Sequence, residues 1–413
     1  MKRESRANFT LPRRVLLEGG VIALLLVLAL ASASQGQDVG QGSEDKEEVA
    51  ARVKALCVKL SDPDEANRAI AAGGLEKLGN RAKEAVPFLA KGLLDPSMRV
   101  RLSCADALGQ MPSFAKEAVP NLAVAMQSKD VRVKRRVACT LGLIGADAQA
   151  AVPALIEALR DPDGPGTMEL VPVAEAAALA LGYIGRPARS AVPALLEATK
   201  SDKGSMAIVS IGALGRIRAE PEKVVPVLIE ILKDPDREAL HRGAVSALGG
   251  FPEQAKETIP HLLKALQREK LQSSVCNAFR EIGPNAAPAV PSLIGLLQNP
   301  ADKSSHNAAV CALAAIGPAG KSAIPALVQH LDTKSSANPA NVMAALVVMG
   351  PDVVLPLISV LQEKNNVRRR WAMDVLGKLG PAAAEAVPFL KALLSDFVIG
   401  PDAARTLQLI EKK

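Results

Sequence analysis

A short segment, Ala-Val-Pro-x-Leu or a close variant of it, recurs along the chain at nearly constant spacing. Its apolar-Pro pair occurs ten times, at intervals of 31 to 34 residues apart from one interval of 40. A fixed period in this range indicates one supersecondary unit that is stacked many times, and it argues against a single compact core. The ten pairs are Val86-Pro87, Val119-Pro120, Val152-Pro153, Val192-Pro193, Val225-Pro226, Ile259-Pro260, Val290-Pro291, Ile324-Pro325, Leu355-Pro356 and Val387-Pro388.

Each repeat has the features of a helical hairpin. Val86-Pro87 opens an apolar run, and proline suits the first turn of a helix because its missing N–H leaves no hydrogen bond unmade there. Asp95-Pro96 is expected to end this first helix and to start the second, since aspartate is a good N-cap and proline a good N1 residue. The second helix is predicted to end near Leu108-Gly109, because glycine is common just after a helix.

The second helix of each repeat carries a regular apolar stripe. Counted from twelve residues before its closing Gly or Pro, offsets 0, 4, 8 and 11 are apolar in five clear copies, which places them on one helical face. The period-2 alternation of a strand extends over no useful length. The five sets are Val100, Cys104, Leu108 and Met111; Val133, Val137, Leu141 and Ile144; Val173, Ala177, Leu181 and Ile184; Leu240, Ala244, Leu248 and Phe251; and Leu271, Val275, Phe279 and Ile282.

The repeats together predict an all-α chain with the architecture of an α–α superhelix, or solenoid. Residues 49–60 and 63–78 form an introductory pair, and residues 398–410 supply a final second helix. This gives about eleven helical hairpins over residues 47–413. No hairpin can bury its apolar stripe alone, so its stability has to come from its neighbours.

The repeat unit x-A-V-P-x-L-x-x-x-L-x-D-P, followed by V-R-x-x-A-A-x-A-L-G-x-I-G, resembles a HEAT repeat. More narrowly, it resembles the HEAT-like repeats first noted in phycobilisome lyases, and the resemblance covers about 360 residues. It implies the fold but no activity, because such repeats serve many unrelated proteins. It also implies an Asp in the intra-repeat turn and an Arg or Lys some residues later, and Asp95 with Arg101 and Asp130 with Arg136 fit this pattern.

The start of the chain differs in composition from the repeats. A basic segment precedes the apolar residues 21–30, and the small residues 31–33 follow, so residues 1–33 have the pattern of a secretory signal peptide. A retained membrane anchor over residues 15–33 is the alternative, although an apolar run of about eleven residues is short for a span. The polar residues 34–46 are predicted to form a linker. We therefore expect a bacterial protein that is exported to the periplasm or beyond and contacts a membrane only through an uncut N-terminal segment.

Charge and aromatic content argue against nucleic acid as the ligand. The formal net charge is +7, of which residues 1–33 contribute +3, and the remaining +4 is ordinary for a chain of this size. Aromatic residues make up 2% of the chain, whereas binding of single strands depends on aromatic stacking platforms.

No set of residues has the spacing of a catalytic, cofactor or metal site. The four histidines have no second His or carboxylate at metal-ligand spacing, and the His-Glu pairs of di-iron HEAT-repeat enzymes are absent. His241 and His306 share one repeat position and are predicted to be solvent-facing or turn residues. The odd number of cysteines, five, and their spacing favour small buried hydrophobic residues rather than disulfides or metal ligands. The cysteines are Cys57, Cys104, Cys139, Cys276 and Cys311, and the other histidines are His261 and His330.

Two basic clusters are the candidate binding residues. The resemblance to HEAT solenoids implies that second helices line a concave face, where Arg101 and Lys134, at equal repeat positions, would be neighbours. Such arginines would bind carboxylates in bidentate fashion, and a tryptophan beside them would suit a binding hot spot. The alternative is a solvated helix start, or arginines paired with the Asp of the preceding turn. The clusters are Arg99, Arg101, Arg132, Lys134, Arg135 and Arg136, and Arg368, Arg369, Arg370 and Trp371.

These observations favour a non-enzymatic interaction scaffold without a cofactor, which binds a protein or peptide along its concave face. One alternative is a lyase-type or other accessory enzyme on a HEAT scaffold. A second is a binder of an anionic polymer, whose affinity would fall steeply with salt. The interval of 40 residues holds an extra loop at residues 161–167, for which a tolerated surface insertion is the expected role. The sequence leaves the oligomeric state open.

Overall fold

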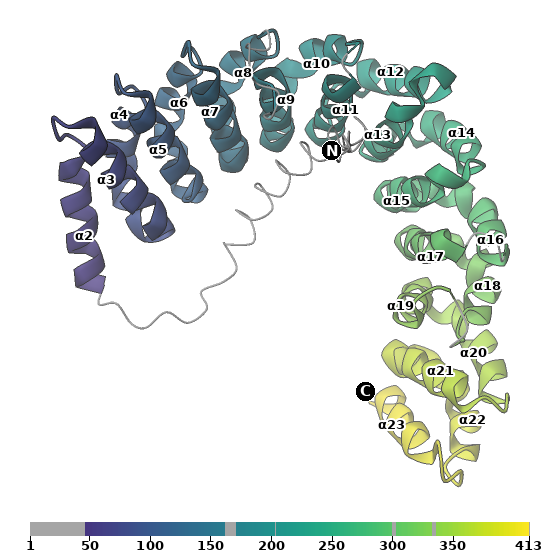
Figure 1. Ribbon diagram of the computed structural model, residues 1–413. Coiled ribbons are helices and arrows are strands. Elements are labelled where there is room, and N and C mark those ends of the chain that lie inside the picture. The colour runs from purple at the N-terminus through teal and green to yellow at the C-terminus, as the bar shows by residue number, and fades with distance from the viewer. Residues whose placement is uncertain (1–45, 162–170, 203, 300–302, 333–335, 413) are drawn as a thin grey trace, which may run out of the picture. The chain divides into compact units, whose positions relative to one another are not determined.

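The structure is a computed structural model that describes residues 46–161, 171–202, 204–299, 303–332 and 336–412 (Figure 1). The predicted signal peptide, residues 34–45 of the predicted linker and residues 162–167 of the predicted loop lie outside the described residues. The described part is helical and contains no strand. The chain divides into two compact units, Met1–Glu220 and Pro221–Lys413, and each unit is described by itself.

The described residues of unit 1 form five helical hairpins, each made of a first and a second helix. The first helices are α2 (Lys46–Lys59), α4 (Val86–Gly92), α6 (Val119–Ala125), α8 (Val152–Ala158) and α10 (Val192–Ala198). The second helices are α3 (Glu65–Leu78), α5 (Met98–Gly109), α7 (Val131–Ile144), α9 (Val173–Ile184) and α11 (Gly204–Ile217).

Unit 2 contains six hairpins of the same kind. The first helices are α12 (Pro221–Lys233), α14 (Ala255–Leu266), α16 (Val290–Gln298), α18 (Ile324–Gln329), α20 (Val354–Leu361) and α22 (Val387–Ala392). The second helices are α13 (Glu238–Gly249), α15 (Gln272–Ile282), α17 (Lys303–Ile316), α19 (Pro339–Met349), α21 (Asn366–Leu379) and α23 (Gly400–Glu411). The described residues thus hold eleven hairpins, the number predicted from the repeat period.

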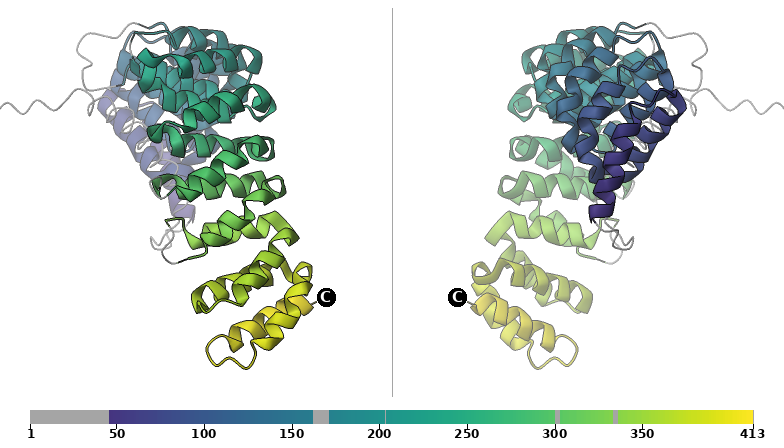
Figure 2. Two further views of the ribbon diagram at one scale, coloured as in Figure 1. Left: turned by 90° about the vertical axis from the view of Figure 1, so that its right-hand side faces the viewer. Right: turned by 90° about the vertical axis from the view of Figure 1, so that its left-hand side faces the viewer.

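In each unit the hairpins form two layers. In unit 1 the second helices α3, α5, α7, α9 and α11 contact one another in series, and the first helices form the other layer (Figure 1). In unit 1 the first helices α4, α6 and α8 also contact the 3₁₀ segments of the next repeat. The side views show the hairpins of unit 2, in green to yellow, following one another along their own stack (Figure 2). A residue on a second helix is therefore placed beside its counterpart one repeat further on.

The apolar-Pro pairs begin most first helices, as predicted. Val86 is the first residue of α4 and Pro87 the second, where the missing N–H of proline removes no helical hydrogen bond. A 3₁₀ segment, η2 (Gly79–Ala85), leads into this helix, and equivalent segments recur in later repeats. The prediction is wrong in α12 and α14, which begin four residues earlier and carry Pro226 and Pro260 inside the helix.

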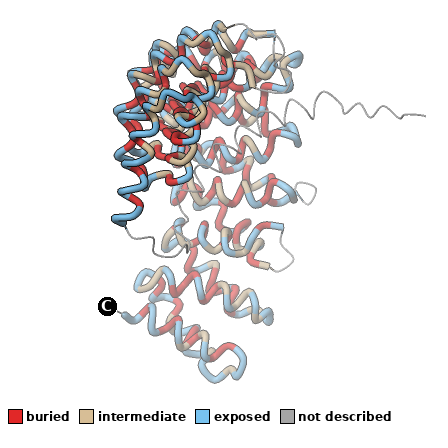
Figure 3. Tube along the Cα trace, turned by 60° about the vertical axis from the view of Figure 1, so that its left-hand side comes forward, coloured by how far each residue is buried: buried red, intermediate tan, exposed pale blue. Residues whose placement is uncertain are grey.

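The apolar stripes of the second helices form the core. All twenty residues of the five predicted sets are buried. The tube coloured by burial shows buried positions on the sides where helices face one another, and exposed positions at the loops and on the outer sides (Figure 3). The prediction of one apolar face for each second helix is confirmed.

The prediction that Asp95-Pro96 caps the second helix is wrong, although the turn aspartate of the next repeat does cap its helix. Asp130 is the N-cap of α7, and its side chain accepts a hydrogen bond from the Arg132 N–H. Asp95 is not a cap, because α5 begins at Met98 after Ser97. The Asp95 carboxylate instead accepts a hydrogen bond from the Ser97 N–H, at 2.8 Å, and is left to bind a neighbouring repeat.

Among the described residues, three stretches are long and apolar enough, by length and composition alone, to cross a membrane: Val131–Ala158, Ser304–Gln329 and Pro339–Leu361. Each runs from a second helix through a 3₁₀ segment into the next first helix. In the first stretch Gly145 ends α7 with a φ of 69°, so the stretch is not one straight helix. Roughly half of each apolar window is buried by the rest of the chain (44 to 56%).

The two glycines of the A-L-G-x-I-G segment have different structural roles. In α9 the first of them, Gly182, faces α11, and a Cβ atom there would lie 2.9 Å from the Cα of Ala213. The second, Gly185, ends the helix with a φ of 72°, which favours glycine because L side chains rarely adopt it. The first glycine therefore lets neighbouring second helices approach closely, and the second turns the chain into the next repeat.

We expect Gly182→Ala to destabilise unit 1, although alanine is the better helix former by about 1 kcal/mol. The added Cβ would force α9 and α11 apart, and overpacking of this kind costs about 1–3 kcal/mol. Gly212→Ala in α11 is the matched control, because a Cβ there has nothing within 4 Å. Urea unfolding followed by circular dichroism should give a lower midpoint for the first variant and an equal or higher one for the second. Shifts of the same sign and size would contradict this role of Gly182.

Candidate partner-binding surface

A row of polar contacts joins the turns of neighbouring repeats in unit 1. Arg68 of α3 donates to the backbone oxygens of Asp62 and Pro63 in its own turn, at 2.9 and 3.0 Å. The same guanidinium donates two hydrogen bonds to the Asp95 carboxylate in the next turn, at 2.8 and 2.9 Å. Burial raises the pKa of Asp95, but the hydrogen bonds from Arg68 and the Ser97 N–H outweigh it, so the net shift is downward. The pair holds two repeats in register.

Arg101 and Lys134 occupy the same repeat position as Arg68 and make the same kinds of contact. Arg101 donates to the backbone oxygens of Asp95 and Pro96, at 2.7 and 2.9 Å. The Lys134 ammonium binds the Asp161 carboxylate of the next turn, at 2.7 Å. Asp95 and Arg101 therefore do not pair through their side chains within one repeat, as the family pattern suggested, and the carboxylate belongs to the neighbouring repeat's arginine. Lys134 therefore joins two turns, whereas Arg101 binds only its own turn and its buried Nε has no partner among the described residues.

The other arginines of the first cluster differ in how well their charges are matched. Arg132 pairs with Asp130 at 3.0 Å, next to it in the turn, and Arg136 pairs with Asp106 of the previous second helix at 2.7 Å. Arg99 is exposed and has no ion pair among the described residues. Arg135 is half-buried, and its one recorded hydrogen bond is a long one of 3.4 Å, to the Val171 backbone oxygen.

Arg135 is consequently a poorly compensated charge. Burial lowers the pKa of Arg135, and the positive charges of Arg136 and Arg132 lower it further, while Cys139 and the Asp130 carboxylate oppose the shift. No carboxylate of the described residues forms an ion pair with it. A guanidinium held out of bulk water without a counter-ion favours an anion supplied from outside.

The second cluster, in unit 2, is more completely satisfied. Arg368 pairs with Glu363 at 2.7 Å, and Arg370 pairs with Asp402 at 2.9 Å. Arg369, with a side chain 12% exposed, donates to the Leu361 backbone oxygen at 3.0 Å and lies 3.5 Å from the Asp396 carboxylate. Trp371 beside them is half-buried. These arginines join the turns of successive repeats, as Arg68 does in unit 1.

The histidines contribute to the same kind of contact, and the prediction that His241 and His306 face solvent is wrong. Both are buried, with 2 and 3% of their surface exposed. The His241 Nε2 lies 2.7 Å from the Asp234 backbone oxygen, and its Nδ1 lies 2.9 Å from Arg268. Arginine can only donate, so Nδ1 accepts and Nε2 donates. His306 binds the Asn299 backbone oxygen at 3.0 Å in the same way.

The cysteines are all free. Cys57, Cys104 and Cys276 are buried, as predicted, whereas Cys139 and Cys311 are half-buried. Burial raises the pKa of both Cys104 and Cys276 to about 12, which keeps these thiols protonated and unreactive at neutral pH. In the part of the chain that the structure describes, no three His, Cys, Asp or Glu side chains come together as a metal site.

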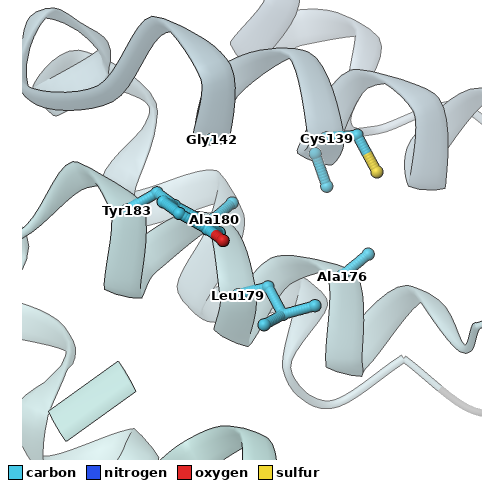
Figure 4. Close-up of a pocket in the computed structure, with 7 residues that line it drawn as sticks. Cys139, Gly142, Ala176, Leu179, Ala180 and Tyr183 are labelled. Carbon is cyan, nitrogen blue, oxygen red and sulfur yellow. The ribbon is translucent and has the colours of Figure 1, made fainter. Parts of the chain in front are cut away.

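A shallow dip lies between α7 and α9, on the side of the second helices that faces away from the first-helix layer; we call this side the second-helix face (Figure 4). Its empty volume of about 170 Å³ includes open solvent, and the dip has no room for a water-sized sphere, so it is a surface depression and not a small-molecule pocket. At one end the Arg216 guanidinium carbon lies 4.3 Å from the centroid of the Tyr183 ring. The lining residues are Ala138, Cys139, Gly142, Ala176, Leu179, Ala180 and Tyr183.

Sequence reasoning missed this dip. Tyr183 occupies a variable position of the A-L-G-x-I-G segment, and it is the only tyrosine in the chain. A residue type that occurs once could have drawn attention to Tyr183. The contact between Tyr183 and Arg216, however, depends on how two repeats stack. The same is true of the unpaired state of Arg135, which becomes visible only when the neighbouring carboxylates have been assigned to other partners.

Comparison with known proteins identifies the repeats. The model of HEAT repeats matches residues 53–116, 169–249 and 192–275. The model of the PBS lyase HEAT-like repeat matches residues 133–161 and 368–396. The chain therefore belongs to the HEAT-repeat proteins, as the repeat unit predicted, and its fold is an all-α solenoid of helical hairpins.

One solved structure supports this fold, and two others are similar over part of the chain. A crystal structure of importin beta is similar, with 15% sequence identity, a TM-score of 0.54, and coverage of 88% of this chain and 57% of that one. This chain thus spans little more than half of the importin structure. The CpcE–CpcF complex of phycocyanin lyase from Nostoc has 23% identity, a TM-score of 0.36, and 60 and 90% coverage. A designed armadillo repeat protein for modular peptide recognition has 17% identity, a TM-score of 0.38, and 48 and 99% coverage. No curated protein sequence matches the chain.

Asp106 predicts a pH dependence of stability in unit 1. Burial raises the pKa of Asp106 to about 6, with a smaller opposing effect from Arg136. The folded chain therefore binds this proton more tightly than the unfolded chain, and the group's contribution to stability is greatest below about pH 4 and is lost as the pH rises through about 6. Because the side chain is 25% exposed, we expect a loss of about 1–2 kcal/mol.

Asp106→Asn should remove this dependence. The difference in unfolding free energy between the wild type and this variant, measured in urea from pH 4 to 7.5, should change in favour of the variant as the pH rises. Arg136→Gln should steepen the wild-type trend, because ionised Asp106 then has no partner at 2.7 Å. A difference that stays constant with pH would refute the proposed burial of the ionised carboxylate.

Proposed function

We propose that this protein is a non-enzymatic interaction scaffold, exported from a bacterial cell, that binds a protein or peptide along the second-helix face. The observation that carries the proposal is the contact of α3, α5, α7, α9 and α11 in series, which places side chains of five repeats on one continuous surface. A ligand on such a surface meets equal positions of successive repeats, as an extended chain does.

The state of the cations refines this proposal. Most arginines of the two basic clusters are committed to the turns of neighbouring repeats, so the clusters as a whole are not the contact surface. Arg99, Arg135 and Arg216, on α5, α7 and α11 of unit 1, are among the cations that form no ion pair with a described residue. This distribution favours a protein ligand that contacts a few cations over an anionic polymer. Binding of a polymer depends on many unpaired cations close together.

Export is proposed on the pattern of residues 1–33 alone. Mass spectrometry of the protein recovered from cell fractions would test it. A mature N-terminus close to residue 34 in the periplasmic or extracellular fraction is the expected result. A full-length chain in the membrane fraction would favour the anchor, and a full-length chain in the cytoplasm would remove export from the proposal.

Photo-crosslinking would test the binding face. A photoreactive residue at Ile208 reports on the second-helix face, and one at Val124 reports on the first-helix layer; their exposed fractions are similar, 42 and 51%. In cells that make the full chain, we expect one dominant partner to be crosslinked from position 208 and not from position 124. Equal crosslinking from both positions, or crosslinking from position 124 alone, would contradict binding on this face. Catalytic turnover of a substrate by the protein purified to homogeneity would favour the enzyme alternative.

A further inference from the structure

His241 of α13 joins the first two hairpins of unit 2. It is buried, and it occupies the repeat position that Arg68 has in unit 1. The ring Nε2 donates to the Asp234 backbone oxygen of its own turn at 2.7 Å. The ring Nδ1 accepts from the Arg268 guanidinium of the next turn at 2.9 Å. His241 thus makes the same two kinds of contact as Arg68, one with its own turn and one with the next repeat.

The contact with Arg268 exists only while His241 is neutral. Arginine has N–H donors and no acceptor, so the Nδ1 atom of His241 has to present a lone pair to it. A proton on Nδ1 would remove this acceptor and would place a second positive charge 2.9 Å from the guanidinium nitrogen. Histidine is the side chain that takes up a proton between about pH 5 and 8. The link is therefore present at neutral pH and is lost as the pH falls through that range.

No carboxylate of the described residues forms an ion pair with the His241 ring. The Asp234 side chain serves its own turn, where it accepts from the Asp236 N–H at 3.0 Å. Glu238, earlier on α13, pairs with Lys270 at 3.3 Å. A proton on the buried ring would therefore add a charge without a counter-ion. The charged groups at the end of α12, in the turn of His241, beside it on α13 and in the next turn are Lys233, Asp234, Asp236, Arg237, Glu238, Arg242, Arg268, Glu269 and Lys270.

His306 of α17 shows that the neighbour of the ring decides how a link responds to acid. It has the same repeat position as His241 and the same contact with a turn, since its Nε2 lies 3.0 Å from the Asn299 backbone oxygen. Its Nδ1, however, lies 2.5 Å from the Ser336 hydroxyl. A hydroxyl can donate or accept, so a protonated His306 can donate to Ser336 and keep both contacts. Arginine cannot exchange roles in this way, and of the two links the one at His241 is broken by a proton.

We propose that His241 is a pH-sensitive link between the first two hairpins of unit 2, closed when the ring is neutral and open when it is protonated. In the open state the turn that carries Arg268 separates from α13. The apolar core between α13 and α15 stays closed, because Gly249 packs so near Ala278 that an added Cβ would lie 2.9 Å from the Ala278 Cα. Acid thus loosens one edge of unit 2 without unfolding it. This inference goes beyond the scaffold function and does not depend on it.

Hydrogen exchange of the full chain, followed by mass spectrometry at pH 5.0, 6.0 and 7.5, tests this link. Protection is calculated against the intrinsic exchange rate at each pH, so that the readout is the opening of the structure. The amides of residues 267–274, which lead from the turn into α15, should lose about tenfold of their protection between pH 7.5 and 5.0, the size of one hydrogen bond to a charged group. The amides of residues 276–282, inside α15, should change less than about twofold, because the core stays closed.

Three variants assign the effect to this contact. His241→Gln should keep its protection at pH 5.0, because an amide can donate to the Asp234 oxygen and accept from Arg268 at any pH. The fold accepts glutamine here, since Gln272 has the same position one repeat further on. Arg268→Ser, which gives the ring a neighbour that can donate and accept, should also remove the pH dependence. Arg280→Ser is the matched control and should keep it, because Arg280 is an exposed cation of α15 without an ion pair among the described residues.

Wild-type protection that stays constant from pH 7.5 to 5.0 would overturn the proposal, and so would an equal loss of protection in His241→Gln. Removal of the pH dependence by Arg280→Ser would overturn it as well, since the effect would then follow the net charge. Circular dichroism at each pH establishes that the variants are folded, and His241→Gln and Arg268→Ser give independent results if one of them unfolds. Each of these outcomes leaves the scaffold function and its crosslinking test unaffected.

Discussion

The close approach of neighbouring second helices is the constraint on which the rest of the structure depends. Gly142 meets Ala180, Gly182 meets Ala213, and in unit 2 Gly249 meets Ala278; a Cβ added at each glycine would lie only 2.9 to 3.2 Å from the alanine Cα. Backbones this close let the apolar stripes of adjacent repeats share one core, which no hairpin could form alone. The same closeness leaves a floor of small residues on the outside, and the dip between α7 and α9 is its visible result.

The fold was predictable from the sequence because its signals are local. The period of the apolar-Pro pairs and the stripe at offsets 0, 4, 8 and 11 each lie within one repeat, and burial of sets such as Val100, Cys104, Leu108 and Met111 follows from them. What the sequence did not disclose depends on contacts between repeats. His241 looked solvent-facing because its carbonyl partner in the turn and Arg268 in the next repeat are not evident from spacing. The helices α12 and α14 also begin earlier than the apolar-Pro pairs predicted. The residues before each pair already form a helical turn, so the proline lies inside the helix.

The candidate site shows the same division between composition and geometry. A count of basic residues marks Arg101 and Lys134 as strongly as Arg135, yet Lys134 pairs with the Asp161 carboxylate and Arg101 donates two short hydrogen bonds to its own turn, whereas Arg135 makes one long hydrogen bond and no ion pair. The sequence does not distinguish a charged residue that stabilises the fold from one that is available to a ligand. Only the assignment of each carboxylate to its partner separates them, and that assignment reduces ten candidate residues to a few uncommitted ones, with Arg216 added from outside both clusters.

The contacts that join repeats link residues that are less than one repeat apart in the sequence. Arg68 binds Asp95, 27 residues further on, and Lys134 binds Asp161 at the same separation. Within each unit, a hairpin has therefore met most of its partners once one more repeat has emerged from the ribosome. Each hairpin can therefore pack during synthesis, as soon as the next repeat is available. In a chain that is translocated across a membrane, the hairpins can pack one at a time during translocation, and little apolar surface stays exposed to solvent.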